Sequence, residues 1–241
     1  MFGGRTPAAA CMNRIRAKIC GLTNADDART AIDAGADALG FNFWTGSRRF
    51  VEPADSLPWI VALPAGVTRV AVMVDPDFSH ALRIGESPGI DALQLHGNET
   101  PDFCARLVGA GHRLIKAIRV RDDASLVDAL RFPTEIPLLL DAYKTGEPGG
   151  TGTTLDWTLA AAFVQDHPDR RILLSGGLTP ENVTDAARRV RPFGVDVASG
   201  VELTGQPRRK DPSRLRAFLT AIRGLNLGVG GGPGENSPGF Y

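Results

Sequence analysis

The chain has 241 residues, and its 27 basic and 27 acidic side chains give a formal net charge of zero. With 43% hydrophobic residues, a chain of this length can build one substantial core but hardly two. The densest basic cluster, Arg208-Arg209-Lys210, ends at Asp211 and predicts a solvated patch, too short for a nucleic-acid or anionic-membrane surface. We therefore expect one domain with no nucleic-acid partner and no membrane partner.

The cysteines indicate neither a disulfide scaffold nor a zinc module. Cys11, Cys20 and Cys104 are odd in number, and no Cys-x-x-Cys pair or Cys/His cluster has metal-ligand spacing, so we expect no metal. No apolar run reaches the roughly 18 residues of a membrane span, and the N-terminus lacks the charged-then-apolar order of a secretory signal. The chain is predicted to be cytoplasmic.

Short apolar runs rich in β-forming residues alternate with helical stretches along the chain. The predicted strands are 15–20, 38–43, 68–74, 92–96, 114–120, 137–143, 172–176 and 194–199. Helix starts and ends are indicated by Asn24, Pro53, Thr179-Pro180-Glu181, Asp211-Pro212, Gly35 and Gly111. Eight such units predict a closed parallel (β/α)₈ TIM barrel. The competing open doubly wound sheet is disfavoured because no Gly-x-Gly-x-x-Gly follows the first strand.

The two ends of the chain show no pattern that would bury them. Residues 1–13 lack clear periodicity and the stretch after Leu225 is rich in glycine, so neither offsets its ordering entropy by burial. We predict a disordered N-terminal extension over 1–13, a (β/α)₈ barrel catalytic domain over 14–223 and a disordered Gly-rich tail over 224–241.

Catalytic groups in a (β/α)₈ barrel come from the C-terminal ends of its strands. Residues at these places with reactive or charged side chains are Cys20, His96, Asp141 and Asp196. Side chains two apart share one face of a strand, which turns Lys18 and Cys20 toward the lumen. Since the eighth strand adjoins the first in a closed barrel and a buried lysine needs a partner, we expect Lys18 to pair with Asp196 or another lumen acid.

Cys20 and Asp141 at one barrel mouth suggest an acid/base pair, in which a thiolate takes a proton and a carboxylic acid gives one. The alternative for Cys20 is a small buried filler, as free cysteine usually is. The alternative for His96 is a hydrogen-bonded core histidine instead of a ligand contact. Asp141 directly follows three leucines, where a carboxyl group is too costly to bury without a partner or a task.

Glycine-containing segments end the last two strands, with Gly176 and Gly177 after the seventh and Ser199 and Gly200 after the eighth. Loops at these places, with the N-terminus of a short extra helix, form the recurrent phosphate site of this fold. Glycine lets backbone N–H groups approach phosphate oxygens closely. Two ordinary strand-to-helix turns are the alternative.

Two further loops carry candidate ligand-binding residues. The loop that contains Gly150 is flexible in composition and suited to fold over a ligand, or else is a connection with no role. Arg48 and Arg49 follow the second strand, and either is suited to clamp a carboxylate in bidentate fashion, or else to remain solvated.

Seven motifs occur in the order that the barrel requires. They are KICGLT at 18–23, GFNF at 40–43 with SRRF at 47–50, QLHG at 94–97, LD at 140–141, GGTG at 149–152 with DW at 156–157, SGGL at 175–178 and DVASGVE at 196–202. Together they resemble the phosphoribosylanthranilate isomerase family of tryptophan biosynthesis, over about residues 14 to 223.

The resemblance implies an aldose-ketose isomerase, an intramolecular oxidoreductase that needs no cofactor. Its reaction is the Amadori rearrangement of N-(5-phosphoribosyl)anthranilate to 1-(2-carboxyphenylamino)-1-deoxyribulose 5-phosphate. Asp141 matches the general acid that opens the furanose ring, and Cys20 matches the general base that removes a proton from the adjacent sugar carbon. The expected substrate-binding residues are Arg49 at the anthranilate carboxylate, His96, Asp196, Gly150, Gly176, Gly177, Ser199 and Gly200. The expected partner is a phosphosugar, and the expected state is a monomer or homodimer.

The proposed chemistry makes a demand on the two pKa values. It needs the thiol ionised and the carboxyl protonated together, which inverts their unperturbed pKa order of roughly 8.5 and 3.9. We expect the site to raise the pKa of the acid, lower the pKa of the thiol, or both.

Two other functions stay open at this point. The histidine-pathway aminoaldose isomerase uses the same barrel type, but its chemistry would favour two carboxylates where this chain has Cys20. A non-catalytic phosphate-binding barrel would use the glycine loops alone.

Overall fold

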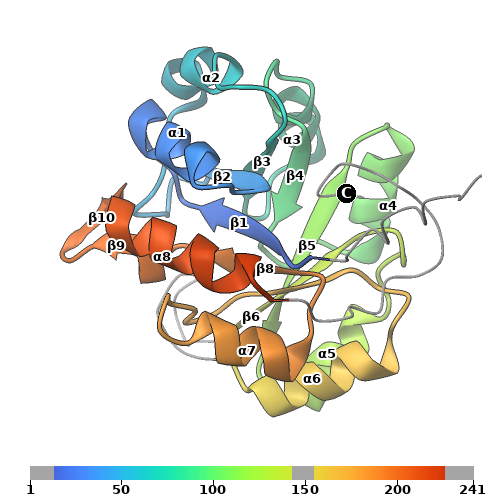
Figure 1. Cartoon of the computed structure of the whole chain (residues 1–241). Coiled ribbons are helices and arrows are strands. Elements are labelled where there is room, and N and C mark those ends of the chain that lie inside the picture. The colour runs from blue at the N-terminus through green and yellow to red at the C-terminus, as the bar shows by residue number, and fades with distance from the viewer. Residues whose placement is uncertain (1–13, 143–154, 226–241) are drawn as a thin grey trace, which may run out of the picture.

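The computed structural model describes residues 14–142 and 155–225. Within them, eight parallel strands close into a barrel in chain order, and helices lie around its outside (Figure 1). The strands are β1 (Arg16–Cys20), β2 (Ala38–Asn42), β3 (Thr68–Met73), β4 (Ala92–Leu95), β5 (Leu114–Val120), β6 (Leu138–Ala142), β7 (Ile172–Leu174) and β8 (Gly194–Val197). The predicted (β/α)₈ barrel is confirmed, and the open-sheet alternative is wrong.

A helix follows each strand of the barrel. These helices are α1 (Ala25–Asp33), α2 (Pro53–Val61), α3 (Phe78–Gly85), α4 (Pro101–Gly109), α5 (Asp123–Ala129), α6 (Trp157–Asp166), α7 (Val183–Val190) and α8 (Pro212–Arg223). The predicted starts at Asn24, Pro53 and Pro212 are confirmed, since Asn24 caps α1 and the two prolines begin α2 and α8. Gly35 and Gly111 follow α1 and α4 with φ of 92°, a left-handed conformation that glycine adopts without strain.

The helix predicted from Thr179-Pro180-Glu181 begins later, at Val183. The Asn182 side chain accepts from the Thr179 backbone N–H at 2.8 Å and donates to the Gly177 carbonyl at 2.9 Å. These two bonds hold the preceding residues as a turn. The proline therefore predicted the right region for this helix but the wrong first residue.

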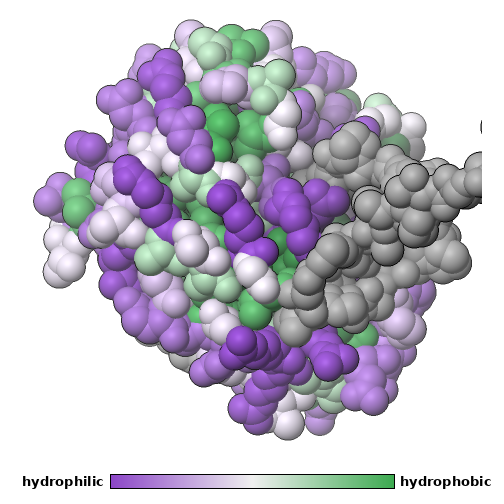
Figure 2. Space-filling view, in the orientation of Figure 1, coloured by the Kyte–Doolittle hydropathy of each residue, from purple (hydrophilic) through white to green (hydrophobic). Residues whose placement is uncertain are grey.

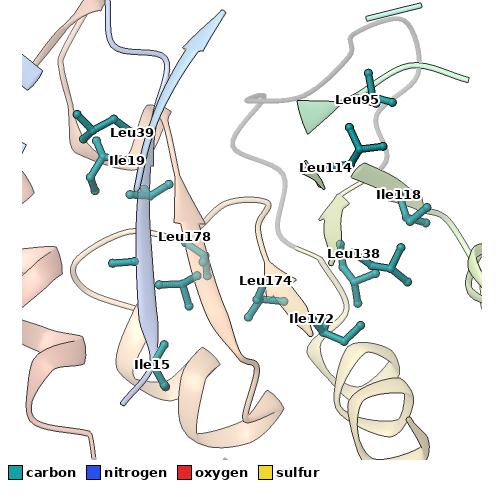
Figure 3. Packing of buried hydrophobic residues seen from close by; sticks show 14 of the residues in the cluster. Ile15, Ile19, Leu39, Leu95, Leu114, Ile118, Leu138, Ile172, Leu174 and Leu178 are labelled. Atoms are coloured by element: carbon teal, nitrogen blue, oxygen red, sulfur yellow. The ribbon is translucent and has the colours of Figure 1, made fainter. Parts of the chain in front are cut away.

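Side chains that alternate along the strands build two apolar layers. The outward layer packs against the helices, and Figure 3 shows Ile19 of β1 and Ile15, just before that strand, within this cluster. On β6, Leu138 and Leu140 belong to this layer, whereas Leu139 points into the barrel. The inner cluster consists of Ala38, Val70, Ile115, Ala117, Leu139 and Leu173. The barrel interior is thus a packed core, and the polar lumen residues lie toward the C-terminal ends of the strands.

The segment between β8 and α8 was only partly predicted. The expected short extra helix is present as η1 (Ser199–Val201), but the chain then forms an unpredicted antiparallel pair, β9 (Glu202–Leu203) and β10 (Gln206–Lys210). The basic cluster lies on β10, where Arg208 and Arg209 are exposed and Lys210 is only 2% exposed. The prediction of a solvated patch is therefore wrong for Lys210, whose ammonium group has buried partners.

Hydrophilic and hydrophobic residues are intermixed over the molecular face drawn in Figure 2. In the part of the chain that the structure describes, no helix combines the length and apolar character that a membrane crossing requires. Leu225 is buried in the core, so the folded domain reaches at least that residue. The predicted extension over 1–13 and residues 226–241 of the predicted tail lie outside the described residues.

Candidate active site

A pocket opens at the C-terminal ends of the barrel strands. Its walls come from β1, β2, β3, β6 and β8 and from the loops after β2, β4, β7 and β8. The predicted site residues that line it are Cys20, Arg49, His96, Asp141, Gly176, Gly177, Asp196 and Ser199. Gly200 lines an adjoining pocket that shares Arg49, Gly177 and Ser199. Gly150 lies outside the described residues.

Lys18 is fully buried in the lumen, and its Nζ donates to Asp196 Oδ1 at 2.7 Å. The two residues are direct neighbours in the register of β1 and β8, so the predicted pairing is confirmed. Burial lowers the pKa of Lys18, but the charges of Asp196 and Cys20 outweigh that effect and leave the pKa raised. The lysine therefore stays protonated beneath the pocket floor.

Cys20 is partly exposed at the end of β1, two residues above Lys18. Burial raises the pKa of its thiol, and the Lys18 ammonium group opposes that rise. The expectation is a raised pKa of the acid, a lowered pKa of the thiol, or both; the part about the thiol is wrong, because the cost of desolvating a thiolate exceeds the attraction of the lysine. The thiol nevertheless lines the pocket.

Gly40 on β2 provides the space that Cys20 and Lys18 occupy. A Cβ at residue 40 would lie 2.8 Å from Cys20 Sγ and 3.0 Å from Lys18 Nζ. We expect Gly40→Ala to lower kcat by about 10²-fold, because a small misplacement of a reacting group has effects of that order. Gly109→Ala is the matched control, since nothing lies within 4 Å of a Cβ there. An unchanged kcat in Gly40→Ala, measured with a normal melting temperature, would contradict this role.

Asp141 lies at the end of β6 and is buried. Its Oδ1 accepts from the Ala142 backbone N–H at 3.0 Å, and its Oδ2 lies 3.3 Å from His96 Nε2. The two atoms are close, but they are not aligned as a hydrogen bond. His96 therefore lies beside the predicted acid on the pocket wall, away from the apolar core.

Gln94 orients the His96 ring from within the lumen. Its Nε2 lies 3.1 Å from His96 Nδ1, and with the amide oriented this way Nδ1 must accept. The neutral ring then carries its proton on Nε2, on the side of Asp141. Lys116 holds the backbone here by donating to the carbonyl of Gly97 and to Glu99 Oε2, at 2.9 and 2.8 Å.

Arg49 is buried, contrary to the alternative of a solvated loop arginine. Its Nε and Nη2 donate to Glu202 Oε1 and Oε2 at 2.6 and 2.9 Å. Glu202 also accepts from Lys210 Nζ at 3.1 Å. Sequence reasoning missed this network, because a partner 153 positions away leaves no local pattern. The family motif contains Glu202, and a charged side chain directly after a glycine loop was the available signal.

The loops after β7 and β8 pack against each other. Gly176 and Gly177 have positive φ values of 84° and 68°, which side-chain-bearing residues rarely adopt. A Cβ at Gly200 would lie 1.9 Å from the Leu178 carbonyl oxygen. Within the described ranges, the backbone N–H groups of Gly177, Ser199 and Gly200 donate to no acceptor. These donors are therefore free to meet a ligand at the edge of the pocket.

Trp44 is a pocket residue that sequence reasoning missed. It follows β2, where its backbone N–H donates to Asn42 Oδ1 at 3.0 Å. A Cβ at Gly46 would lie 2.3 Å from the Trp44 ring, so glycine gives the indole its place. An aromatic residue just after a strand end was the only signal.

Over residues 14–142 and 155–225, no group of three His, Cys, Asp or Glu side chains is arranged to hold a metal ion.

The fold and the position of the pocket define a (β/α)₈-barrel enzyme. A family model described as N-(5'phosphoribosyl)anthranilate (PRA) isomerase matches residues 17–221. The chain belongs to this family.

Relatives and solved structures agree with the family match. An N-(5'-phosphoribosyl)anthranilate isomerase of Chromohalobacter salexigens is 45% identical over 212 residues, which cover 88% of this chain and 95% of that protein. The phosphoribosyl anthranilate isomerase structure from Thermotoga maritima has a TM-score of 0.79 and 39% identity, covering 88% and 100% of the two chains. A structure of such an isomerase with reduced 1-(o-carboxyphenylamino)-1-deoxyribulose 5-phosphate has a TM-score of 0.75 and 38% identity, with the same coverage.

Proposed function

We propose that the chain catalyses the Amadori rearrangement of N-(5-phosphoribosyl)anthranilate in tryptophan biosynthesis, with Asp141 as general acid and Cys20 as general base. The observation that carries the assignment of roles is that one pocket exposes both groups. Cys20 is the last residue of β1 and Asp141 the last but one of β6, and β7 and β8 lie between these strands around the barrel. A phosphate held at the loops after β7 and β8 would direct the sugar between the two groups.

In the first step, the Asp141 carboxylic acid gives its proton to the furanose ring oxygen. The bond from that oxygen to C1 breaks, and the anthranilate nitrogen supplies the electron pair that forms a protonated Schiff base. In the second step, the Cys20 thiolate removes the proton from C2, and the C–H electrons form the C1–C2 double bond while the nitrogen becomes neutral. The resulting enolamine then tautomerises to the ketone.

Arg49 is proposed to hold the anthranilate carboxylate. Two of its N–H groups are fixed by Glu202, which keeps the guanidinium group in one orientation at the pocket wall. In the described part of the chain, Nη1 has no acceptor and is available to a ligand. His96, Asp196 and Gly176 line the remaining wall and are proposed to contact the substrate. The role of Gly150 over the ligand stays a prediction.

The phosphate is proposed to bind the backbone N–H groups of Gly177, Ser199 and Gly200. In Gly200→Ala the new Cβ would collide with the Leu178 carbonyl and displace these donors. We expect KM and the inhibition constant of inorganic phosphate to rise about tenfold, the effect of losing one hydrogen bond to a charged group. Gly224→Ala serves as the control, because nothing lies within 4 Å of a Cβ there. A crystal in which a substrate analogue places its phosphate elsewhere would refute the site.

The activity itself is tested with purified protein and two substrates. We expect the fluorescence of phosphoribosylanthranilate to decay in the presence of the chain. The same preparation is assayed with the histidine-pathway aminoaldose, which has the same phosphosugar end. Turnover of the aminoaldose alone would favour the second isomerase, and turnover of neither substrate would favour a non-catalytic phosphate-binding barrel.

A cytoplasmic location, the phosphosugar as the partner, and a monomeric or homodimeric state remain proposals.

A further inference from the structure

Five buried charged side chains form ion pairs beside Cys20. They are Lys18, Arg49 and Lys210, which are cationic, and Asp196 and Glu202, which are anionic. Every one of these side chains is less than a tenth exposed. The group therefore carries one positive charge in excess, which a thiolate at Cys20 would neutralise. We call these five side chains the charge cluster.

Lys210 occupies a defined place beside Cys20. Its Nζ donates to the Ala198 carbonyl at 2.9 Å and to Glu202 Oε1 at 3.1 Å. The register of β1 and β8 ends with Ile19 opposite Val197, so Cys20 and Ala198 are the next residues along the two neighbouring chains. The backbone contact thus anchors the ammonium group one strand away from the thiol.

Arg49 is held on the other side of Cys20. Its side chain packs over Gly21, the residue after Cys20, where a Cβ would lie only 2.2 Å from Arg49 Cδ. Glu202 bridges Arg49 and Lys210 by accepting from both. The turn that bears Cys20 therefore lies between two cations that share one carboxylate.

We propose that Lys210 is a positioning residue for the isomerase reaction: it supplies the unbalanced positive charge of the charge cluster and thereby favours the thiolate form of Cys20. The inference rests on the proposed role of Cys20 as the base. Lys210 touches neither the substrate nor the reacting atoms. Beside the cluster, the buried Asp27 carboxylate accepts from the Lys210 backbone N–H at 2.8 Å and lies 3.5 Å from Arg209 Nε. The other titratable groups that line the pocket are Arg48 after β2, His96 after β4 and Asp141 on β6.

The electrostatic directions agree with this assignment. Burial raises the pKa of Cys20, while Lys18 and Lys210 both act to lower it. Burial, and to a lesser degree the positive charge of Arg49, leave the pKa of Lys210 below its ordinary value, although the negative charges of Glu202 and Cys20 oppose that effect. The thiolate and the ammonium group therefore stabilise each other's charged form.

The test varies the net charge of the cluster and reads the titration of Cys20 directly. In Lys210→Met the excess charge falls from one to zero, and in Glu202→Gln it rises to two. The double variant returns the charge to one and is the matched control. The second-order rate of Cys20 alkylation by iodoacetamide is measured against pH without substrate, and the Cys20 peptide is quantified by mass spectrometry. Cys104, whose burial raises its pKa to about 11, is the internal reference.

We expect the Cys20 pKa to rise by about one unit in Lys210→Met and to fall by about one unit in Glu202→Gln. At a pH below the thiol pKa, these shifts change the alkylation rate about tenfold in opposite directions. The double variant should titrate like the unmodified protein. A merely structural role for Lys210 would not move the titration in opposite directions. If Lys210→Met does not fold, the Cys20 titration in Glu202→Gln is the test of the proposal.

Unchanged Cys20 titration in the folded variants would overturn the proposal. Its failure is separable from failure of the proposed function, because alkylation needs no turnover. If Cys20→Ala keeps near-normal turnover, the thiol is not the base and the proposed role fails. The alkylation series would still show whether Lys210 sets the ionisation of the thiol.

Discussion

Replacing Cys20 with alanine should lower kcat by about 10²–10⁴-fold, the usual contribution of one positioned proton-transfer group. Alanine cannot accept the proton from C2, whereas the phosphate and carboxylate contacts proposed for the substrate are untouched. Substrate binding should therefore change little. The loss of substrate fluorescence under saturating and limiting substrate separates kcat from KM.

The control for this variant is its melting temperature, which shows whether the pocket floor still packs. Near-normal turnover in Cys20→Ala, together with a large loss in Asp141→Asn, would contradict the assignment. The thiol would then be a packing residue, and water positioned by His96 would be the candidate base.

Replacing Asp141 with asparagine should lower kcat by a similar factor, about 10²–10⁴-fold. An amide of nearly the same shape cannot give a proton to the ring oxygen as the C1–O bond breaks. The fold should persist, because the side chain keeps its size and can still meet the Ala142 N–H. The same fluorescence assay measures the effect, and a kcat within a factor of two of the unmodified protein would contradict it.

The pH dependence of kcat/KM tests the pair as a unit. The active form needs an ionised thiol and a protonated carboxyl, so activity should follow a bell-shaped profile. Burial raises the pKa of the thiol, so only a minor fraction of the protein carries the thiolate at neutral pH. The active form is therefore a minor one. Cys20→Ala should lose the limb that belongs to the thiol. A flat profile in the unmodified protein would contradict paired acid/base catalysis.

The barrel and the first residues of its site were predictable because they follow local patterns. Alternation along β1 and β6 separated Cys20 and Asp141 from the outward leucine and isoleucine side chains. Closure of the barrel then predicted that Lys18 would meet Asp196 or another lumen acid, and the structure shows Asp196 at 2.7 Å. Periodicity and strand order are properties of neighbouring residues, so a sequence carries them directly.

The charged network behind the pocket was not predictable in the same way. Lys210 looked like part of a solvated basic run, yet β10 turns it inward against Glu202. The pairing depends on a hairpin inserted between β8 and α8, a departure from the repeating unit of the barrel. Likewise, the sign of the Cys20 pKa shift depends on how far burial outweighs Lys18, which residue spacing does not indicate.

The structure of this protein with reduced 1-(2-carboxyphenylamino)-1-deoxyribulose 5-phosphate tests the central claim most directly. We predict that the phosphate lies at Gly177, Ser199 and Gly200, with the sugar carbons between Cys20 and Asp141. Cys20 Sγ should lie within about 4 Å of C2, and an Asp141 carboxylate oxygen should be within hydrogen-bond reach of the oxygen that closes the furanose ring. A bound product whose sugar carbons lie far from either group would contradict the assignment of Cys20 and Asp141 as base and acid.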